Sequence, residues 1–213
     1  MARTSGTVTF LSTDIEGSTR LLERLGRDRY GTVLAEQQRL LREIFAAHGG
    51  DEVDTQGDSF LVAFRSANDA LTAAVAAQRA LAGHEWPDGL ELRVRIGVHS
   101  GEADSSGGRY VGLAVHRAAR IGAAAHGGQV LVSSATRELV EDELGDGISL
   151  VELGTVRLKD FDRPERVAQV AAEGLETDFP ALDTVEEGDT AFRLSPLLRI
   201  RWDVLGRRLR RKR

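Results

Sequence analysis

Apolar and polar residues alternate at the start of the chain and predict a β-strand from Thr7 to Thr13. Asp14 follows at the end of this strand. Leucines at helical spacing come next, and a second, longer helical pattern runs from Gly26 to His48. Ser18 and Thr19 are suitable caps for the first of these helices. We therefore expect one strand followed by two helices.

Two short strand patterns follow, joined by a turn that places Asp58 at the tip of a hairpin. Further strands and helices then follow in mixed order, which indicates an α+β domain. We expect a ferredoxin-like antiparallel sheet with flanking helices on one face. The expected strands are Glu52–Gln56, Ser59–Phe64, Leu92–Ser100, Gln129–Ser133, Ile148–Leu153, Val156–Leu158 and Val167–Ala171, and the expected helices are Ala67–Ala82, Gly112–Ala125 and Ser134–Val140.

The composition is that of a soluble globular domain, because 41% of the 213 residues are hydrophobic and 29% are charged. The N-terminus lacks the apolar stretch of a signal peptide and no apolar run is long enough to span a bilayer, so we expect a cytoplasmic protein. The chain has no cysteine. Any bound metal should therefore be a hard cation held by oxygen, which favours magnesium, manganese or calcium over zinc.

The net charge of -5 is unevenly distributed, because residues 193–213 carry nine Arg or Lys against the single Asp203. We expect a catalytic domain over residues 1–172, an acidic linker over 173–192 and a basic amphipathic tail over 193–213. Such a tail suits the inner membrane surface or an acidic partner, and a disordered solubilising tail is the alternative. The acidic domain argues against binding to nucleic acid.

Two aspartates carry the most informative chemistry in the sequence. Asp14 ends the first strand, and Asp58 lies in the hairpin turn that follows the two helices. Carboxylates at neighbouring strand ends can bridge two divalent ions, one of which activates an attacking oxygen while the other holds phosphate oxygens. Either aspartate alone would be read as an ordinary turn or cap residue.

Other residues fit the binding of a phosphate. The segment Ile15 to Thr19, with Gly17 and Ser18, offers backbone amides at the start of a helix, which is a ready anion site. His116 and Arg120 are four residues apart and therefore share one face of a helix. An arginine there can stabilise charge on phosphate, although solvated surface residues have the same spacing.

Taken together, these motifs resemble the catalytic domain of the class III nucleotidyl cyclases, the adenylate and guanylate cyclase family. The resemblance covers roughly Thr7 to Ala172. Several ordered motifs at consistent separations are far more specific than any one motif. The matching stretches are Val8–Leu21, Gly57–Phe64, Arg95–Glu102, Gly112–Gly128 and Leu153–Lys159.

The resemblance implies a head-to-tail homodimer with two active sites at its interface, with a heterodimer as the alternative. Asp14 and Asp58 of one subunit would hold two Mg²⁺ or Mn²⁺ ions, assisted by the carbonyl of Ile15. The other subunit would supply Arg120 for the transition state and Lys159 for the triphosphate. The ribose 3′-hydroxyl of a nucleoside triphosphate would attack the α-phosphorus and release pyrophosphate.

The sequence departs from the family at three positions that concern the nucleoside. The family's adenine-selecting lysine falls on Asp54, its partner aspartate on Arg109, and its ribose-orienting asparagine on His116. A carboxylate at Asp54 can accept hydrogen bonds from guanine, and Arg109 can donate to guanine, so this pair favours GTP. The rival explanation is a charge-reversed salt bridge that reads no base.

Several other functions stay open. The chain could cyclise a pyrimidine nucleotide or ATP, or it could be a nucleotide-binding regulatory module that has lost turnover. A diguanylate cyclase is disfavoured, because Gly49-Gly50-Asp51-Glu52 lies at a helix end and not in the hairpin where that class carries its similar motif. An RNA-binding domain is disfavoured because only 5% of the residues are aromatic.

Overall fold

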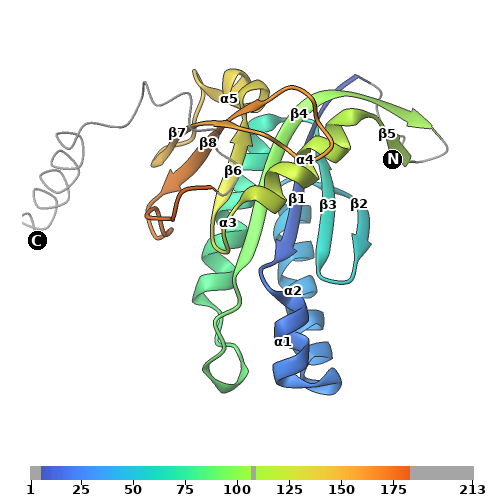
Figure 1. Cartoon of the computed structure of the whole chain (residues 1–213), viewed down its shortest axis with the longest axis vertical. Helices are drawn as coiled ribbons and strands as arrows, with labels where there is room; N and C mark the ends of the chain where they lie inside the picture. Colours follow the sequence, from blue (N-terminus) through green and yellow to red (C-terminus); the bar gives the residue numbers. More distant parts are fainter. Residues whose placement is uncertain (1–5, 107–108, 183–213) are drawn as a thin grey trace, which may run out of the picture.

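A single twisted sheet forms the centre of the protein, seen in a computed structural model that describes residues 6–106 and 109–182 (Figure 1). Its strands follow the order β2-β3-β1-β4-β6-β8-β7, and β5 pairs with the C-terminal end of β4. Neighbouring strands are antiparallel except for β4 and β6. The strands are β1 (Gly6–Ile15), β2 (Asp51–Gln56), β3 (Ser59–Phe64), β4 (Val94–Ser106), β5 (Arg109–Val111), β6 (Val130–Ser133), β7 (Ile148–Val156) and β8 (Glu165–Ala172).

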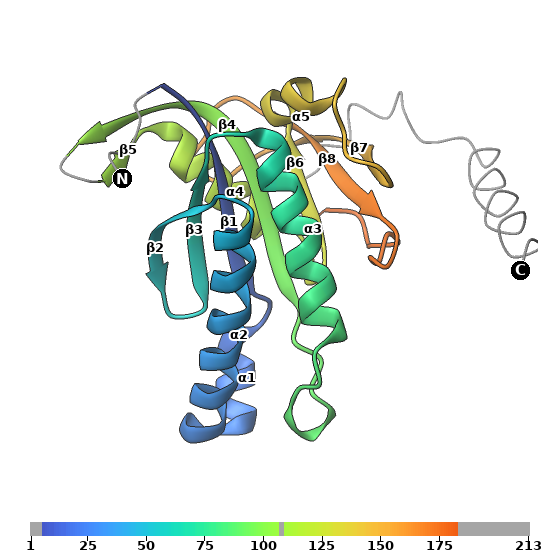
Figure 2. The ribbon, with the colours of Figure 1, turned by 180° about the vertical axis from the view of Figure 1, so that it is seen from behind.

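Helices cover both faces of this sheet, as the front and back views show (Figures 1 and 2). Helices α2 and α3 pack together on one face, whereas α4 crosses β1 and β4 on the other. The expected α+β fold with an antiparallel sheet is therefore confirmed. The helices are α1 (Ser18–Leu25), α2 (Arg27–Ala47), α3 (Ala67–Gly83), α4 (Leu113–Ala124) and α5 (Ser134–Val140), with a 3-10 turn at Pro87–Gly89.

The expectation that the helices cover only one face is wrong, and the residues of β1 give the reason. Leu11 belongs to the core cluster under α2 and α3, whereas Val8 and Phe10 pack with Ala114 and Ala118 of α4. Successive side chains of a strand point to opposite faces, so a strand that is apolar on both sides needs cover on both sides.

A very close approach between two glycines fixes α4 on the sheet. A Cβ atom added to Gly97 of β4 would lie 2.1 Å from the backbone nitrogen of Gly122 in α4. A side chain at Gly97 would therefore push the helix away. Because α4 also packs on β1, this contact determines where Arg120 lies relative to the sheet.

Some local details differ from the sequence-based expectations. Helix α1 follows Gly17 in the left-handed region (φ 67°), and no side chain caps it, so the expected cap from Ser18 or Thr19 is absent. Helix α5 is capped by Ser133, one residue earlier than expected, because its hydroxyl accepts a hydrogen bond from the backbone nitrogen of Thr136 (3.2 Å).

The C-terminal strands also differ. Two strands were expected, Ile148–Leu153 and Val156–Leu158, but one continuous strand, β7, runs from Ile148 to Val156. Its register shifts between Glu152 and Gly154 without ending the pairing to β8. Gly154 has a φ of 95°, which glycine adopts readily. Strand β5 pairs with the end of β4 and was not expected at all.

The segment after β8 contacts the domain at several points. Arg93 pairs with Glu176 (2.5 Å), the ring of Phe179 stacks on His126, and Leu182 is buried. Residues 183–213, which include the rest of the expected linker and the basic tail, lie outside the described residues. Among the helices of the described ranges, none combines the length and apolar character needed to cross a membrane.

A buried polar network joins β1, β4, β6 and α5. The Nδ1 atom of His99 lies 2.8 Å from the hydroxyl of Ser133, which lies 3.1 Å from that of Thr136. The chain continues from Thr136 to Ser100 (3.1 Å) and from Ser100 to Thr9 (2.8 Å). Burial, and then the positive charge of Arg117, lower the pKa of His99 to about 4. His99 is therefore neutral in the folded protein at neutral pH.

This shift predicts a pH dependence of stability. The unfolded chain binds a proton at His99 near pH 6.5, whereas the folded chain does so only near pH 4. The free energy of unfolding should therefore fall as pH drops from 6.5 towards 4, by about 3 kcal/mol at most from this residue. The free energy of unfolding, measured with urea between pH 5 and 7, should depend less steeply on pH for His99→Gln than for the wild type. His84→Gln serves as the control, and equal slopes for wild type and His99→Gln would contradict the prediction.

Candidate active site

The structure brings Asp14 and Asp58 together at one end of the sheet. Strands β1 and β3 pair antiparallel up to Thr13 and Phe60, so the end of β1 lies beside the β2–β3 turn. The backbone nitrogen of Ile15 donates a hydrogen bond to Oδ2 of Asp58 (3.0 Å). The hydroxyl of Ser59 donates to Oδ1 of Asp14 (3.1 Å). β1 therefore positions the Asp58 carboxylate, and β3 positions the Asp14 carboxylate.

Arg95 is a further residue of this site, and sequence reasoning missed it. It lies opposite Asp14 in the β1–β4 register, and its guanidinium forms an ion pair with the Asp14 carboxylate. Its Nε atom is buried without a hydrogen-bond partner among the described residues. The sequence signal was present, since Arg93 and Arg95 alternate with apolar residues at the start of β4. The register that aligns Arg95 with Asp14 is not visible in the sequence.

The electrostatics of the site favour a bound cation. Burial, followed by the charge of Asp14, raises the pKa of Asp58, although hydrogen bonds from backbone amides and from Ser18 oppose the shift. Burial and the two aspartates also raise the pKa of the Tyr30 hydroxyl. The guanidinium of Arg95 balances only one of the two carboxylates, so an added cation would relieve the remaining repulsion.

The donor atoms fit a hard divalent cation. The site offers the carboxylates of Asp14 and Asp58, and Ile15 is held directly between them by its hydrogen bond to Asp58. The described residues contain no cluster of three or more His, Asp or Glu side chains that could form a closed metal cage. Two carboxylates suit Mg²⁺ or Mn²⁺, which commonly keep waters and take further oxygen ligands from substrate phosphates.

The loop between β1 and α1 borders this site. Gly17 takes the left-handed conformation, and Ser18 and Thr19 form the first turn of α1, which lacks a side-chain cap. The first amides of a helix have no partner within the helix, so they are open to an anion. A cavity of about 270 Å³ adjoins the loop, lined in part by Gly17 and by Arg20 and Arg24 of α1.

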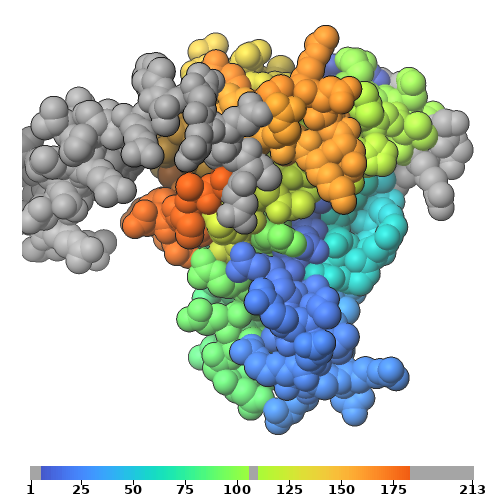
Figure 3. Space-filling view, in the orientation of Figure 1, coloured from blue at the N-terminus to red at the C-terminus, as the bar shows by residue number. Residues whose placement is uncertain are grey.

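The basic residues of the expected site form a second group. His116 and Arg120 lie on α4, and Lys159 lies in the turn after β7, which Figure 3 shows at the surface in orange. Arg120 pairs with Asp160, the residue next to Lys159. Within the described ranges, no hydrogen bond or ion pair joins Arg120 or Lys159 to Asp14 or Asp58. Within the described part of one chain, the expected cationic residues and the two aspartates are therefore not bonded to each other.

The residues expected to contact the base are only partly described. Asp54 is exposed on β2, directly after a register shift in the β2–β3 pairing. Its carboxylate accepts hydrogen bonds from the backbone of Thr55 (3.0 Å) and from the side-chain amide of Gln56 (2.8 Å). Arg109 begins β5, and its side chain lies outside the described part of the structure, so its expected pairing with Asp54 stays a prediction.

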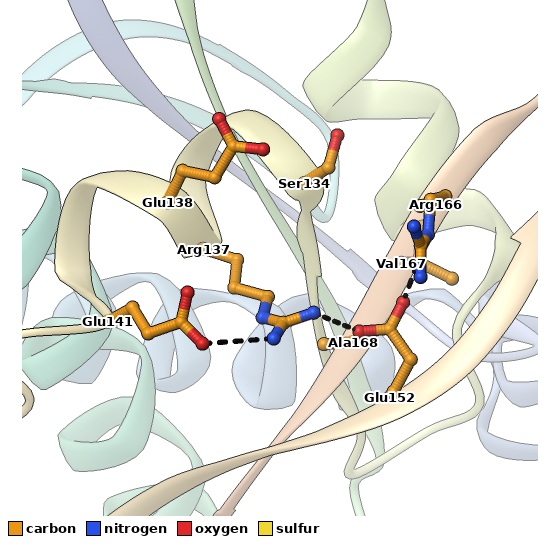
Figure 4. Close-up of a pocket in the computed structure, with 8 residues that line it drawn as sticks. All are labelled: Ser134, Arg137, Glu138, Glu141, Glu152, Arg166, Val167 and Ala168. Carbon is orange, nitrogen blue, oxygen red and sulfur yellow. Dashed lines mark hydrogen bonds and ion pairs between the residues drawn. The ribbon is translucent and has the colours of Figure 1, made fainter. Parts of the chain in front are cut away.

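Another cavity contains none of the expected site residues. It has a volume of about 270 Å³ and lies between α5, β7 and β8 (Figure 4). Ion pairs neutralise much of the charge on its walls, since Arg137 contacts both Glu141 and Glu152, and Arg166 contacts Glu152 as well. The aspartates therefore remain the candidate site.

Comparison with known proteins agrees with this fold. A solved adenylate cyclase from Trypanosoma brucei, in its monomeric state, superposes with a TM-score of 0.73 and 26% identity, covering 85% of this chain and 96% of that one. The adenylate cyclase of Mycosarcoma maydis is 36% identical over 165 residues, which are 66% of this chain and 6% of that protein.

An uncharacterized protein of Mycobacterium tuberculosis is 36% identical over 189 residues, which cover 88% of this chain. The chain spans 64% of the length of that relative. Residues 1–170 match the family described as the adenylate and guanylate cyclase catalytic domain. The fold, the paired aspartates and this match lead to one conclusion: the chain belongs to the adenylate and guanylate cyclase catalytic domain family.

Proposed function

We propose that the chain is a metal-dependent nucleotidyl cyclase, which converts a nucleoside triphosphate into a 3′,5′-cyclic nucleotide and pyrophosphate. The observation that carries this proposal is the pair Asp14 and Asp58, held side by side in a partly buried site whose electrostatics favour a cation. Membership of the cyclase family supports it, as does the similarity to proteins named adenylate cyclase.

The residues divide the chemistry between them. Asp14, Asp58 and the Ile15 carbonyl would hold two Mg²⁺ or Mn²⁺ ions, which supply activation of the ribose 3′-hydroxyl and neutralisation of phosphate charge when bound. Asp14 would then exchange its ion pair with Arg95 for the metal. The amides of residues 17–19 would bind triphosphate oxygens. Because this reaction needs no protein nucleophile, positioning and electrostatic stabilisation account for most of the rate.

A second copy of the chain would complete each site. Arg120 and Lys159 of one copy would face the aspartates of the other, with Arg120 stabilising charge on the α-phosphate and Lys159 binding the triphosphate. The lack of a direct bond between the two groups, within the described ranges of one chain, supports this arrangement. Exposed apolar residues around the start of α4 support it as well, since Val111 is 60% exposed and Leu113 is 70% exposed.

GTP is the substrate that the side chains favour. The carboxylate of Asp54 can accept hydrogen bonds from guanine, whereas the N1 atom of adenine is itself an acceptor and would be repelled. Arg109 and His116 would contact the base and ribose. The two cyclases compared above are named adenylate cyclases, which points instead to ATP. Cyclisation of a pyrimidine nucleotide, or binding without turnover, are the remaining outcomes of the test below.

The first prediction concerns the reaction itself. Purified protein incubated with Mn²⁺ and each of ATP, GTP, UTP and CTP should form cyclic nucleotide and pyrophosphate in equal amounts, fastest with GTP. Asp58→Asn keeps the side-chain volume but removes a charge from the metal site, and it should slow the reaction about 100-fold or more. The exposed Asp28→Asn is the matched control. Nucleotide binding without product from any of the four would contradict the proposal, and a preference for ATP would contradict only the assignment of guanine.

The second prediction concerns the shared site. Asp58→Asn and Arg120→Ala should each be slowed about 100-fold or more alone, because every site in either homodimer lacks one required group. Mixed in equal amounts, the two variants should recover about a quarter of the wild-type rate, since half of the dimers are mixed and each of these has one intact site. No recovery after exchange of subunits would show that one chain carries a complete site.

A further inference from the structure

A tight turn places Lys159 next to Asp160, and Asp160 pairs with Arg120 of α4. The backbone nitrogen of Phe161 donates to the carbonyl of Leu158 (3.2 Å), which closes the turn. Leu158 is buried, and both residues pack with Ile121 of α4. Lys159 and Asp160 are therefore exposed at the tip of a turn that apolar contacts fix against α4.

The backbone of Asp160 is unusual. Its φ is 65°, and Asp160 and Asp88 are the two residues other than glycine with a positive φ among the described residues. Aspartate and asparagine enter this left-handed region more readily than most residues, but it still carries a cost. A residue kept in this conformation invites a functional explanation when it also makes a specific contact.

The specific contact is an ion pair with Arg120. The Asp160 carboxylate accepts a hydrogen bond from Nη2 of Arg120, and the two side chains are 60% and 40% exposed. The other nitrogen atoms of the Arg120 guanidinium have no hydrogen-bond partner within the described ranges. Ion pairs this exposed contribute little to stability, so a stronger anion can replace Asp160 easily.

We propose that Asp160 is a positioning residue that serves as the resting counterion of Arg120, and that a nucleotide phosphate replaces it. This inference rests on the proposed function, because it takes Arg120 to be a phosphate-binding residue. Asp160 holds the guanidinium beside Lys159 in the absence of nucleotide. The triphosphate engages both cations, whereas Asp160 pairs with Arg120 alone.

This exchange has a consequence for affinity. The carboxylate and the triphosphate compete for the same guanidinium, and after the exchange the carboxylate still lies close to phosphate oxygens of like charge. Both effects weaken binding. Removal of the Asp160 charge should therefore tighten nucleotide binding about 3- to 10-fold at low salt, and the gain should shrink as salt screens the charges.

The test measures binding without turnover. Wild type and variants are titrated, at low and high salt, with a 3′-deoxynucleoside triphosphate, which lacks the attacking hydroxyl, and with inorganic triphosphate. Asp160→Asn keeps the side-chain volume and tolerates the left-handed backbone. Asp162→Asn removes the same charge two residues away, at an exposed position, and is the matched control.

We expect tighter binding of both probes to Asp160→Asn, at most a twofold change for Asp162→Asn, and no gain from Asp160→Asn in an Arg120→Ala background. The melting temperature of Asp160→Asn should match that of the wild type, because apolar contacts hold the turn. Binding by Asp160→Asn alone, with none by the wild type, would also support the proposal.

Unchanged or weaker binding by Asp160→Asn would overturn the proposal about Asp160. An equal gain in affinity in the Arg120→Ala background, or for Asp162→Asn, would also overturn it, as would no binding by any of the proteins. Product formation is followed separately with the reactive nucleotides. A chain that binds nucleotide but forms no product contradicts the cyclase proposal, while the comparison of Asp160→Asn with Asp162→Asn still decides the role of Asp160.

Discussion

The repulsion between two carboxylates, held together by the pairing of β1 with β3, is the constraint on which the rest of the structure depends. Two ionised side chains separate unless the backbone prevents it. Here the Ile15 amide and the Ser59 hydroxyl each bind the aspartate of the other strand, so neither carboxylate can move away alone. The repulsion persists in the folded chain, and a cation relieves it.

Each of the two groups of residues in the proposed site contains an ion pair that forms within one chain. Asp14 has Arg95 as its counterion, and Arg120 has Asp160. These two ion pairs balance the charges of Asp14 and Arg120 in the free chain, whereas Asp58 has no ion-pair partner within the described ranges. In the proposed complete site, both ion pairs would be exchanged for contacts with metal and phosphate. Asp14 and Arg120 would thus serve as ion-pair partners in the free chain and as metal and phosphate ligands in the complete site.

The sequence predicted most of the fold, because strand alternation, helical spacing and glycine turns are local signals. It also predicted that Asp14 and Asp58 would meet, since both follow strand ends. It could not predict Arg95 or Asp160, whose roles arise from the β1–β4 register and from a turn packed on α4. The cover of the second face by α4 was missed for the same reason: the close approach of Gly97 and Gly122 joins residues that are distant in sequence.

The central claim is that Asp14 and Asp58 together form a cation site. Titration of Mn²⁺ into the purified chain, followed by electron paramagnetic resonance, tests it most directly, with a 3′-deoxynucleoside triphosphate present to supply phosphate ligands. The account predicts two bound Mn²⁺ ions per site in the wild type, and affinity at least about 10-fold weaker in Asp14→Asn and in Asp58→Asn. If both variants bound Mn²⁺ with the same affinity as the wild type, the account would be contradicted.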